Sequence, residues 1–239
     1  MSVLVLLHYW IGSINNPQIY YRDYFKKFNI ISDNIKINRE LKNDIPDKSW
    51  LLYLLEVFNQ QNVAVELNLI CQFDNQNYFE AIFSGYNKYR FNNVLPETGN
   101  TYLRQIKFNK SHSSIEYYLK NLNSETDELF VLDLSNNPSF SFQFSNFFTG
   151  IEWWNKISNR PYPIRLDVEI SNLLYGYNDN TEDSESIVFF PVNSLSSNKD
   201  GQSISYPVRF TNNETKNGCL CYNIALGSCV NGLDTTLSN

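Results

Sequence analysis

Hydrophobic and polar residues alternate with a period of two in several stretches of the chain. The clearest stretches are residues 63–74, 115–120, 139–145 and 164–171. Successive side chains of a strand point to opposite faces, so this alternation predicts half-buried antiparallel strands. The apolar residues 3–7 predict a further strand near the N-terminus.

Turn-forming residues separate these stretches. Asn, Asp, Gly and Pro gather at residues 74–77, 97–100, 121–126 and 136–138. Short strands with turns at such spacing are typical of two packed sheets. The pattern therefore predicts an all-β fold, a two-sheet antiparallel β-sandwich.

Residues 48–61 fit two interpretations. One helical stripe would contain Trp50, Tyr53, Leu54, Val57 and Phe58, but the same run could form a strand that is buried on both faces. The strands expected on either side favour a strand here.

The composition changes after Tyr177. Residues 178–186 are acidic and polar, residues 187–192 predict a strand, and residues 194–203 predict a loop. The acidic residues Asp179, Glu182, Asp183 and Glu185 lack the glycine and the spacing of a calcium loop, so they predict a solvated loop. We expect one β-sandwich domain over residues 1–239, with 178–239 as a loop-rich C-terminal extension packed on it.

Composition narrows the classes of function. Of the 239 residues, 42% are hydrophobic and 15% aromatic, which is enough for a large core. The net charge is -6 and the basic residues are scattered, so we expect no nucleic-acid partner. No apolar run approaches the roughly 18 residues of a membrane span. We expect an extracellular or cell-surface location, with a cytoplasmic one as the alternative; the sequence predicts no oligomeric state.

The four cysteines are Cys71, Cys219, Cys221 and Cys229. Either Cys219 or Cys221 could form a disulfide with Cys229 and leave the other to reach Cys71, or all four could be buried thiols. The two histidines, His8 and His112, are distant in sequence from these cysteines and from each other. The sequence therefore predicts no metal and no cofactor.

One carboxylate stands out, because Glu152 lies between Ile151 and two tryptophans after an aromatic run. Burying a carboxylate costs several kcal/mol unless it is paired or protonated. In a strand, Glu152 shares a face with Trp154, and the polar face of the 63–74 strand carries Glu66, Asn68 and Gln72. If these strands are neighbours, a carboxylate and amides converge on an aromatic-lined groove.

The order of strands in LNLICQF, YFEAIFSGY, ETGNTYLRQIKF, FFTGIEWWNKI and PIRLDVEISN resembles that of the glutamic peptidases, the eqolisin family. The resemblance spans about residues 60–175 and implies a concanavalin A-like jelly roll. The family uses a Glu in an Ala-Glu-Trp motif with a Gln from an earlier strand. Glu152, in Ile-Glu-Trp-Trp, matches the Glu, whereas the hairpin places Asn68 at the Gln position and the nearest glutamine is Gln72.

The resemblance implies that Glu152 acts as a general base and then as an acid, while the amide of Gln72 or Asn68 stabilises the oxyanion. Asn is one methylene shorter than Gln, and a displacement of about 1 Å can cost on the order of 10²-fold in rate. A degenerate site is therefore an alternative to an active one.

Three hypotheses follow. The first is a groove that binds an extended glycan or peptide through Trp154, Glu152, Glu80, Glu66 and the neighbouring amides. The second is an acid-acting glutamic endopeptidase that uses Glu152 and an amide partner. The third is a surface or assembly protein without a ligand site. A glycosidase variant would need Glu152 about 5 to 9 Å from Glu80 or Glu66.

Overall fold

The computed structural model describes residues 5–13, 28–40, 49–72, 76–85, 87–155, 166–181, 184–191, 194–196, 203–205, 208–210, 221–224 and 229–231. Every regular element in these ranges is a strand, and the strands form two antiparallel sheets. Within the same ranges, no helix has the length and apolar character needed to span a membrane.

The first sheet has the order β14-β13-β1-β10-β3-β4-β5-β6. Its strands are β14 (Ser203–Ser205), β13 (Ser194–Ser196), β1 (Val5–Ser13), β10 (Phe144–Asn155), β3 (Ser49–Asn59), β4 (Ala64–Gln72), β5 (Asn77–Phe83) and β6 (Asn87–Arg90).

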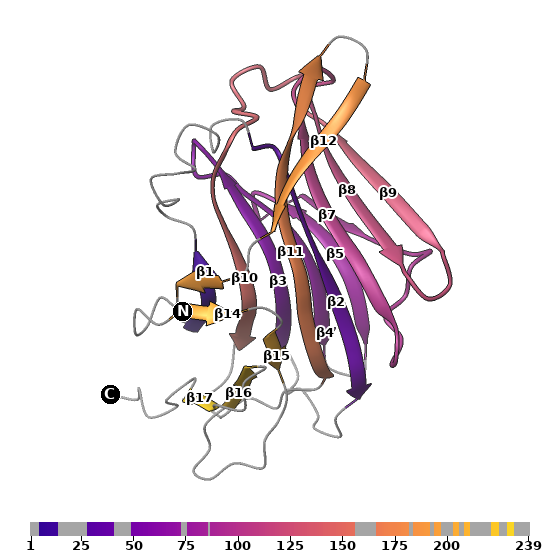
Figure 1. Cartoon of the computed structure of the whole chain (residues 1–239), viewed down its shortest axis with the longest axis vertical. Helices are drawn as coiled ribbons and strands as arrows, with labels where there is room; N and C mark the ends of the chain where they lie inside the picture. Colours follow the sequence, from indigo (N-terminus) through magenta and orange to yellow (C-terminus); the bar gives the residue numbers. More distant parts are fainter. Residues whose placement is uncertain are drawn as a thin grey trace.

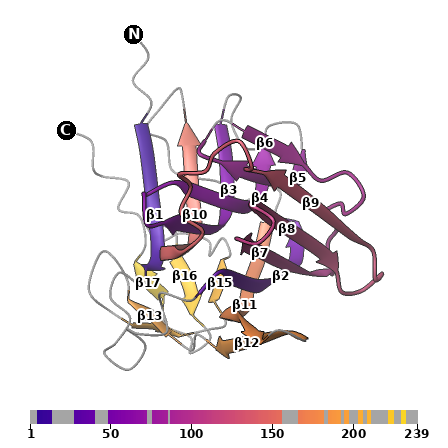
Figure 2. The same ribbon diagram turned by 90° about the horizontal axis from the view of Figure 1, so that it is seen from above.

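The second sheet has the order β17-β16-β15-β11-β2-β7-β8-β9, with β12 paired to β11 beside this path. Its strands are β17 (Cys229–Asn231), β16 (Cys221–Ile224), β15 (Val208–Phe210), β11 (Leu166–Thr181), β2 (Ile30–Glu40), β7 (Thr101–Asn109), β8 (Ser114–Asn121), β9 (Asp127–Asp133) and β12 (Ser184–Pro191). Figures 1 and 2 show the two layers from the front and from above.

Alternate residues of facing strands fill the space between the sheets. The first sheet contributes Leu51, Tyr53, Leu55 and Val57 from β3, all buried, and β7 of the second sheet contributes Tyr102, Ile106 and Phe108. The predicted all-β, two-sheet antiparallel sandwich is confirmed. Of residues 48–61, the stretch Ser49–Asn59 forms strand β3, as the neighbouring strands favoured.

One predicted strand is wrong over most of its length. Of the predicted stretch 139–145, residues 139–143 are not in a strand, and β10 begins at Phe144. Side chains bond both backbone groups of Ser141: Asn59 donates to the Ser141 carbonyl at 3.2 Å, and the Ser141 N–H donates to Gln61 at 3.0 Å. Phe140 packs edge-on against Phe108, so the aromatic alternation reports core packing rather than a sheet ladder.

The predicted acidic loop after Tyr177 is also wrong where it can be seen. Strand β11 continues to Thr181, and β12 pairs with it in a hairpin that includes Asn180 opposite Glu185. Glu182 and Asp183 lie outside the described residues. The remaining C-terminal strands extend both sheets, β13 and β14 beside β1 and β15 to β17 beside β11. The assignment of 178–239 as an extension of one domain stays a prediction.

Candidate functional site

The strands in the middle of the first sheet have two distinct faces. On β3, the odd-numbered residues from Leu51 to Val57 face the second sheet and join the main core. The even-numbered residues face the opposite way, and Leu52 and Leu54 belong to a separate apolar cluster. We call this second side of the first sheet the outer face.

Strand register places the candidate residues on the outer face. Leu52 pairs with Glu152 of β10 on one side and with Ile70 of β4 on the other. Trp50 likewise pairs with Trp154 and with Gln72. The strands that carry Glu152 and Gln72 are in one sheet but are not neighbours, because β3 lies between them. Two strand spacings amount to about 10 Å.

The positions of Glu152 and Trp154 are therefore known by register, and their side chains lie outside what the structure describes. Gln72 and Asn68 are offset from the row of Glu152 by two residues in opposite directions along β4. Register alone thus gives both amides the same separation from Glu152. Their hydrogen bonds distinguish them.

Gln72 is hydrogen-bonded to Tyr78, a member of an apolar cluster on the outer face. The cluster contains the buried side chains of Leu52, Leu54, Ile70 and Tyr78, with Trp50 packed against them. The Gln72 amide nitrogen donates to the Tyr78 hydroxyl at 2.6 Å. The Arg90 guanidinium lies over the Tyr78 ring, 4.1 Å from its centre. Burial, reinforced by the nearby Glu80 carboxylate, raises the pKa of Tyr78 to about 12, so this phenol is neutral.

Asn68 is fully buried and is held at both ends of its amide. Its nitrogen donates to a Glu66 carboxylate oxygen at 2.6 Å, and its oxygen accepts from the Leu55 N–H at 3.3 Å. These two bonds fix which way the amide points. An Asn in this setting is poorly placed to donate to a substrate at the position of Glu152.

Carboxylates surround Asn68 on the outer face. Glu80 pairs with Asn68 across β4 and β5, and Glu56 pairs directly with Glu66 across β3 and β4. Glu80 is buried and forms a long ion pair with Lys88, with 3.5 Å between nitrogen and oxygen. Burial raises the pKa of Glu80, and the charges of Lys88 and Arg90 oppose that rise.

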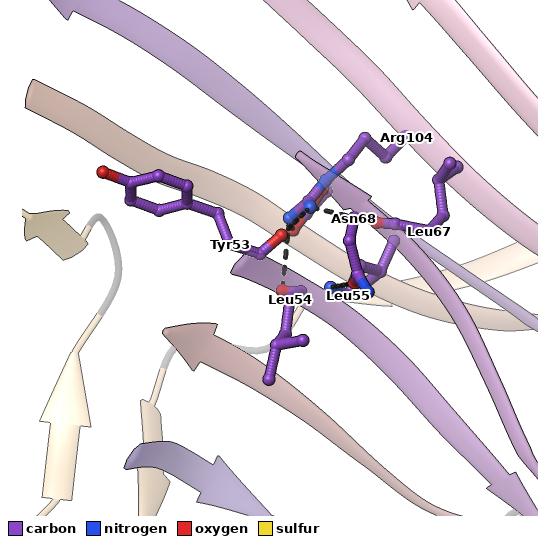
Figure 3. A network of polar contacts seen from close by, with 7 residues as sticks. Tyr53, Leu54, Leu55, Leu67, Asn68 and Arg104 are labelled. Carbon is purple, nitrogen blue, oxygen red and sulfur yellow. Dashed lines mark hydrogen bonds and ion pairs between the residues drawn. The ribbon is translucent and has the colours of Figure 1, made fainter. Parts of the chain in front are cut away.

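The Leu55 N–H can donate to the Asn68 side chain because Arg104, from the second sheet, takes the regular acceptor of this N–H in the β3–β4 ladder. In the regular pattern of this ladder the Leu55 N–H would donate to the Leu67 carbonyl. That carbonyl instead accepts from Arg104 of β7 at 3.0 Å. Figure 3 shows the Arg104 guanidinium among the backbone groups of Tyr53, Leu54 and Leu67, with the Asn68 side chain directed at Leu55.

Arg104 is fully buried and all five of its N–H groups have acceptors. Two donate to the Asp33 carboxylate of β2, at 2.8 and 2.6 Å, and the other three donate to the carbonyls of Tyr53, Leu67 and Leu54. Burial raises the pKa of Asp33, and the guanidinium counteracts this effect. Arg104 thus connects the two sheets and shapes the strand that carries Asn68.

Arg104 and Asp33 are not among the residues predicted from the sequence. Both lie at inward-facing positions of apolar alternations, Asp33 between Ile31 and Ile35 and Arg104 between Tyr102 and Ile106. Opposite charges at inward positions of two strands were a signal for a buried pair, since buried charges are normally paired.

The described residues contain no group of His, Cys, Asp and Glu side chains that could hold a metal ion. Cys71 is buried in the main core. Cys221 and Cys229 belong to neighbouring strands, where Cys221 pairs with Asn231 and Cys229 with Asn223. Cys219 and the side chains of Cys221 and Cys229 lie outside the described part, so disulfides and buried thiols both stay alternatives.

Comparisons with known proteins support the fold. No protein-family model matches the chain, and no curated protein matches it. Among solved structures, scytalido-glutamic peptidase with a transition state analog inhibitor matches at a TM-score of 0.50 and 11% identity, over 88% of this chain and 97% of that chain.

Two further structures match with lower TM-scores. SCP-B, a member of the eqolisin family in complex with the tripeptide Ala-Ile-His, has a TM-score of 0.47 at 10% identity, over 87% of this chain and 96% of that chain. Lectin UEA-II complexed with galactose has a TM-score of 0.35 at 8% identity, over 53% and 70%. The structural resemblance to the glutamic peptidases that the sequence predicted is confirmed, at the level of the fold.

Proposed function

We propose that the outer face of the first sheet binds an extended polypeptide, with Glu152 near the centre of the bound segment. The observation that carries this proposal is the strand register, which places Glu152, Gln72 and Asn68 on one face of three adjacent strands. Glu80 on β5 extends the same face by one strand.

The chemistry of this face suits a peptide backbone. An extended chain presents N–H donors and carbonyl acceptors at regular intervals. Glu66 supplies carboxylate acceptors and Gln72 supplies an amide, beside the half-buried ring of Trp50. The fold likeness favours a peptide over a glycan, because the structure that matches at a TM-score of 0.50 is named as a peptidase.

Binding can be tested with a fluorescent, denatured casein and measured by anisotropy. Wild type should bind, and Trp154→Ala should bind at least about tenfold more weakly, because aromatic anchors dominate such contacts. Glu125→Gln, on an exposed turn between β8 and β9, is the matched control and should bind as wild type does. Wild type that binds a glycan array but not casein would overturn the peptide assignment. Wild type that binds neither would favour a surface or assembly protein.

A second candidate function, hydrolysis of the bound peptide in acid, is favoured by the placement of Glu152 and Gln72. Glu152 would activate a water as general base, and an amide N–H would stabilise the oxyanion. Gln72 suits this role better than Asn68. Gln72 has the longer side chain, whereas Asn68 is buried and bonded at both ends of its amide.

Three variants distinguish hydrolysis from binding. Glu152→Gln should abolish casein cleavage between about pH 2 and 7 and leave binding within about threefold of wild type, because it removes the base and keeps the shape. Gln72→Ala should lower kcat more than it raises KM, whereas Asn68→Asp should change kcat much less. Cleavage that persists in Glu152→Gln would contradict this second candidate without affecting the first.

A further inference from the structure

Strand β9 is an edge strand of the second sheet, next to β8. It pairs with β8, and no other described strand pairs with it (Figure 1). An exposed edge strand presents unpaired backbone groups that can bind another extended chain. Whether β9 can bind such a chain depends on which residues carry the unpaired backbone groups and on which side chains lie beside them.

The hydrogen-bond phase of the β8–β9 ladder identifies the outward-facing groups. The ladder is bounded by the Asn121 N–H donating to the Thr126 carbonyl and the Leu134 N–H donating to the Ser113 carbonyl, both at 2.8 Å. In an antiparallel pair the bonded positions alternate, so the even-numbered residues of β9 bond to β8. The N–H and C=O groups that point away from β8 therefore belong to Asp127, Leu129, Val131 and Asp133.

The same four residues share one side-chain face. Leu129 is 53% exposed and Val131 is 48% exposed, and an exposed aspartate lies two residues beyond each of them. At one end, the Ser135 N–H and hydroxyl both donate to the Asp133 carboxylate, and these bonds lower the pKa of Asp133. The edge thus has two apolar positions between two negative charges.

A second copy of the chain fits this edge poorly in the register that pairs both apolar residues. Antiparallel self-pairing about Phe130 would place Leu129 opposite Val131 of the other copy, which is favourable. It would also place Asp127 opposite Asp133 at both ends, and like charges directly opposite each other destabilise a strand pair. The net charge of -6 adds to the repulsion between copies.

We propose that β9 is a docking edge for an extended segment of a partner protein, with apolar residues opposite Leu129 and Val131 and a lysine or arginine opposite Asp127 and Asp133. The backbone groups of the edge provide the attachment, and the alternating side chains provide the specificity. The site lies on the second sheet and is independent of the function proposed for the outer face of the first sheet.

The experiment titrates the intact protein with the peptide KTVTVTK, blocked at both ends, and follows amide hydrogen exchange by NMR. At saturating peptide, exchange of the Leu129 and Val131 amides should slow by about tenfold or more, because these N–H groups gain acceptors. Exchange of the Phe130 and Leu132 amides, already bonded to β8, should stay within about twofold. Equal protection of all four amides, or of none, would overturn the proposal.

Two variants and one control peptide sharpen the result. The charge-reversed peptide ETVTVTE should not protect the wild-type edge, and the double variant Asp127→Lys with Asp133→Lys should reverse this preference. Val131→Pro removes an outward N–H without removing a bond to β8, so it should fold and lose the protection of Leu129 by KTVTVTK. If the charge reversal leaves the preference unchanged, or if wild type dimerises in sedimentation with protection of the same edge, the assignment of a basic partner segment is wrong.

Discussion

Arg104 is a charged side chain at a position of β7 where its neighbours in the alternation are apolar. Its burial is tolerated because each N–H group has an acceptor, two on Asp33 and three on backbone carbonyls of the facing sheet. A pair of this kind need not add stability over an apolar pair of equal volume. Removing only one partner is destabilising, because the other charge stays buried without a counter-charge.

We expect Arg104→Met to destabilise the protein by about 3–5 kcal/mol, because Asp33 then becomes a buried carboxylate without a counter-charge. Adding Asp33→Leu should recover part of this loss, and the remainder reflects the carbonyls of Tyr53, Leu54 and Leu67 that lose a donor. Urea unfolding of the two single variants and the double variant measures the coupling. Strictly additive losses would show that the ion pair is not the cause.

The raised pKa of Glu80 predicts how the stability of the protein changes with pH. Its pKa is raised from the ordinary value of 4.5, first by burial, with Lys88 and Arg90 opposing. The stability that this group contributes is therefore present below its unfolded-state pKa and is lost as the pH rises through its folded-state pKa. Glu80→Gln cannot ionise, so the stability of this variant relative to wild type should increase from about pH 4 to about pH 7.

Urea unfolding at the two pH values tests this prediction, and Lys88→Met is the internal control. Lys88 lowers the pKa of Glu80, so its removal should raise that pKa further and enlarge the pH-dependent loss. A stability difference between Glu80→Gln and wild type that does not change with pH would contradict the raised pKa.

At the scale of the element, β3 and β4 form a ladder with one opened pair. Arg104 takes the Leu67 carbonyl, and the Asn68 side chain replaces it as acceptor for the Leu55 N–H. A backbone gap in the middle of a sheet is thus closed by two side chains from different sheets. The same Asn68 amide donates to Glu66, so this arrangement also orients a carboxylate on the outer face.

We expect Asn68→Ala to cost about 1–3 kcal/mol, because it leaves the buried Leu55 N–H without an acceptor. Hydrogen exchange of the Leu55 amide should accelerate relative to other core amides of β3. Asn68→Asp keeps an acceptor for Leu55 but places an oxygen against Glu66, so it should preserve Leu55 protection and still lose stability. Unchanged exchange at Leu55 in Asn68→Ala would show that this bond is not what protects the amide.

The elements show why some strands could be predicted from the sequence and others could not. Strands β4 and β8 alternate clearly because one face is apolar and the other largely polar. Residues 48–61 were ambiguous because β3 is apolar on both faces, where Leu52 and Leu54 form the outer cluster. The alternation singles out neither β2 nor β7, because Asp33 and Arg104 interrupt their apolar faces.

The candidate site was predictable only in part. Alternation correctly assigns Glu66, Asn68 and Gln72 to one face of β4, since side chains in a strand have a period of two. The intervening strand β3 and the opened ladder depend on pairings between distant segments, which no local pattern encodes. The predicted groove and the roles of Glu152, Gln72, Asn68, Trp154, Glu80 and Glu66 stay predictions.

At the scale of the whole molecule, polar bonds connect the two sheets in addition to the shared apolar core. The Tyr53 hydroxyl on β3 donates to the Leu166 carbonyl on β11 at 2.7 Å. The Tyr89 hydroxyl, at the end of the first sheet, donates to Glu128 of β9 at 2.7 Å, and Glu128 also accepts from the Asn92 and Asn93 N–H groups. Together with Arg104, these bonds join the sheets in the middle and at the margin formed by β6 and β9.

We therefore expect the two sheets to unfold as one cooperative unit, and Tyr53→Phe tests this. The substitution removes the hydroxyl, leaves a buried carbonyl without that donor, and should lower the free energy of unfolding by about 1–3 kcal/mol. Native-state hydrogen exchange should report the same decrease at Leu69, in β4 of the first sheet, and at Ile106, in β7 of the second. If only the Leu69 amide responds, the sheets open separately, and the bonds that cross between them stabilise local packing rather than the sandwich as a whole.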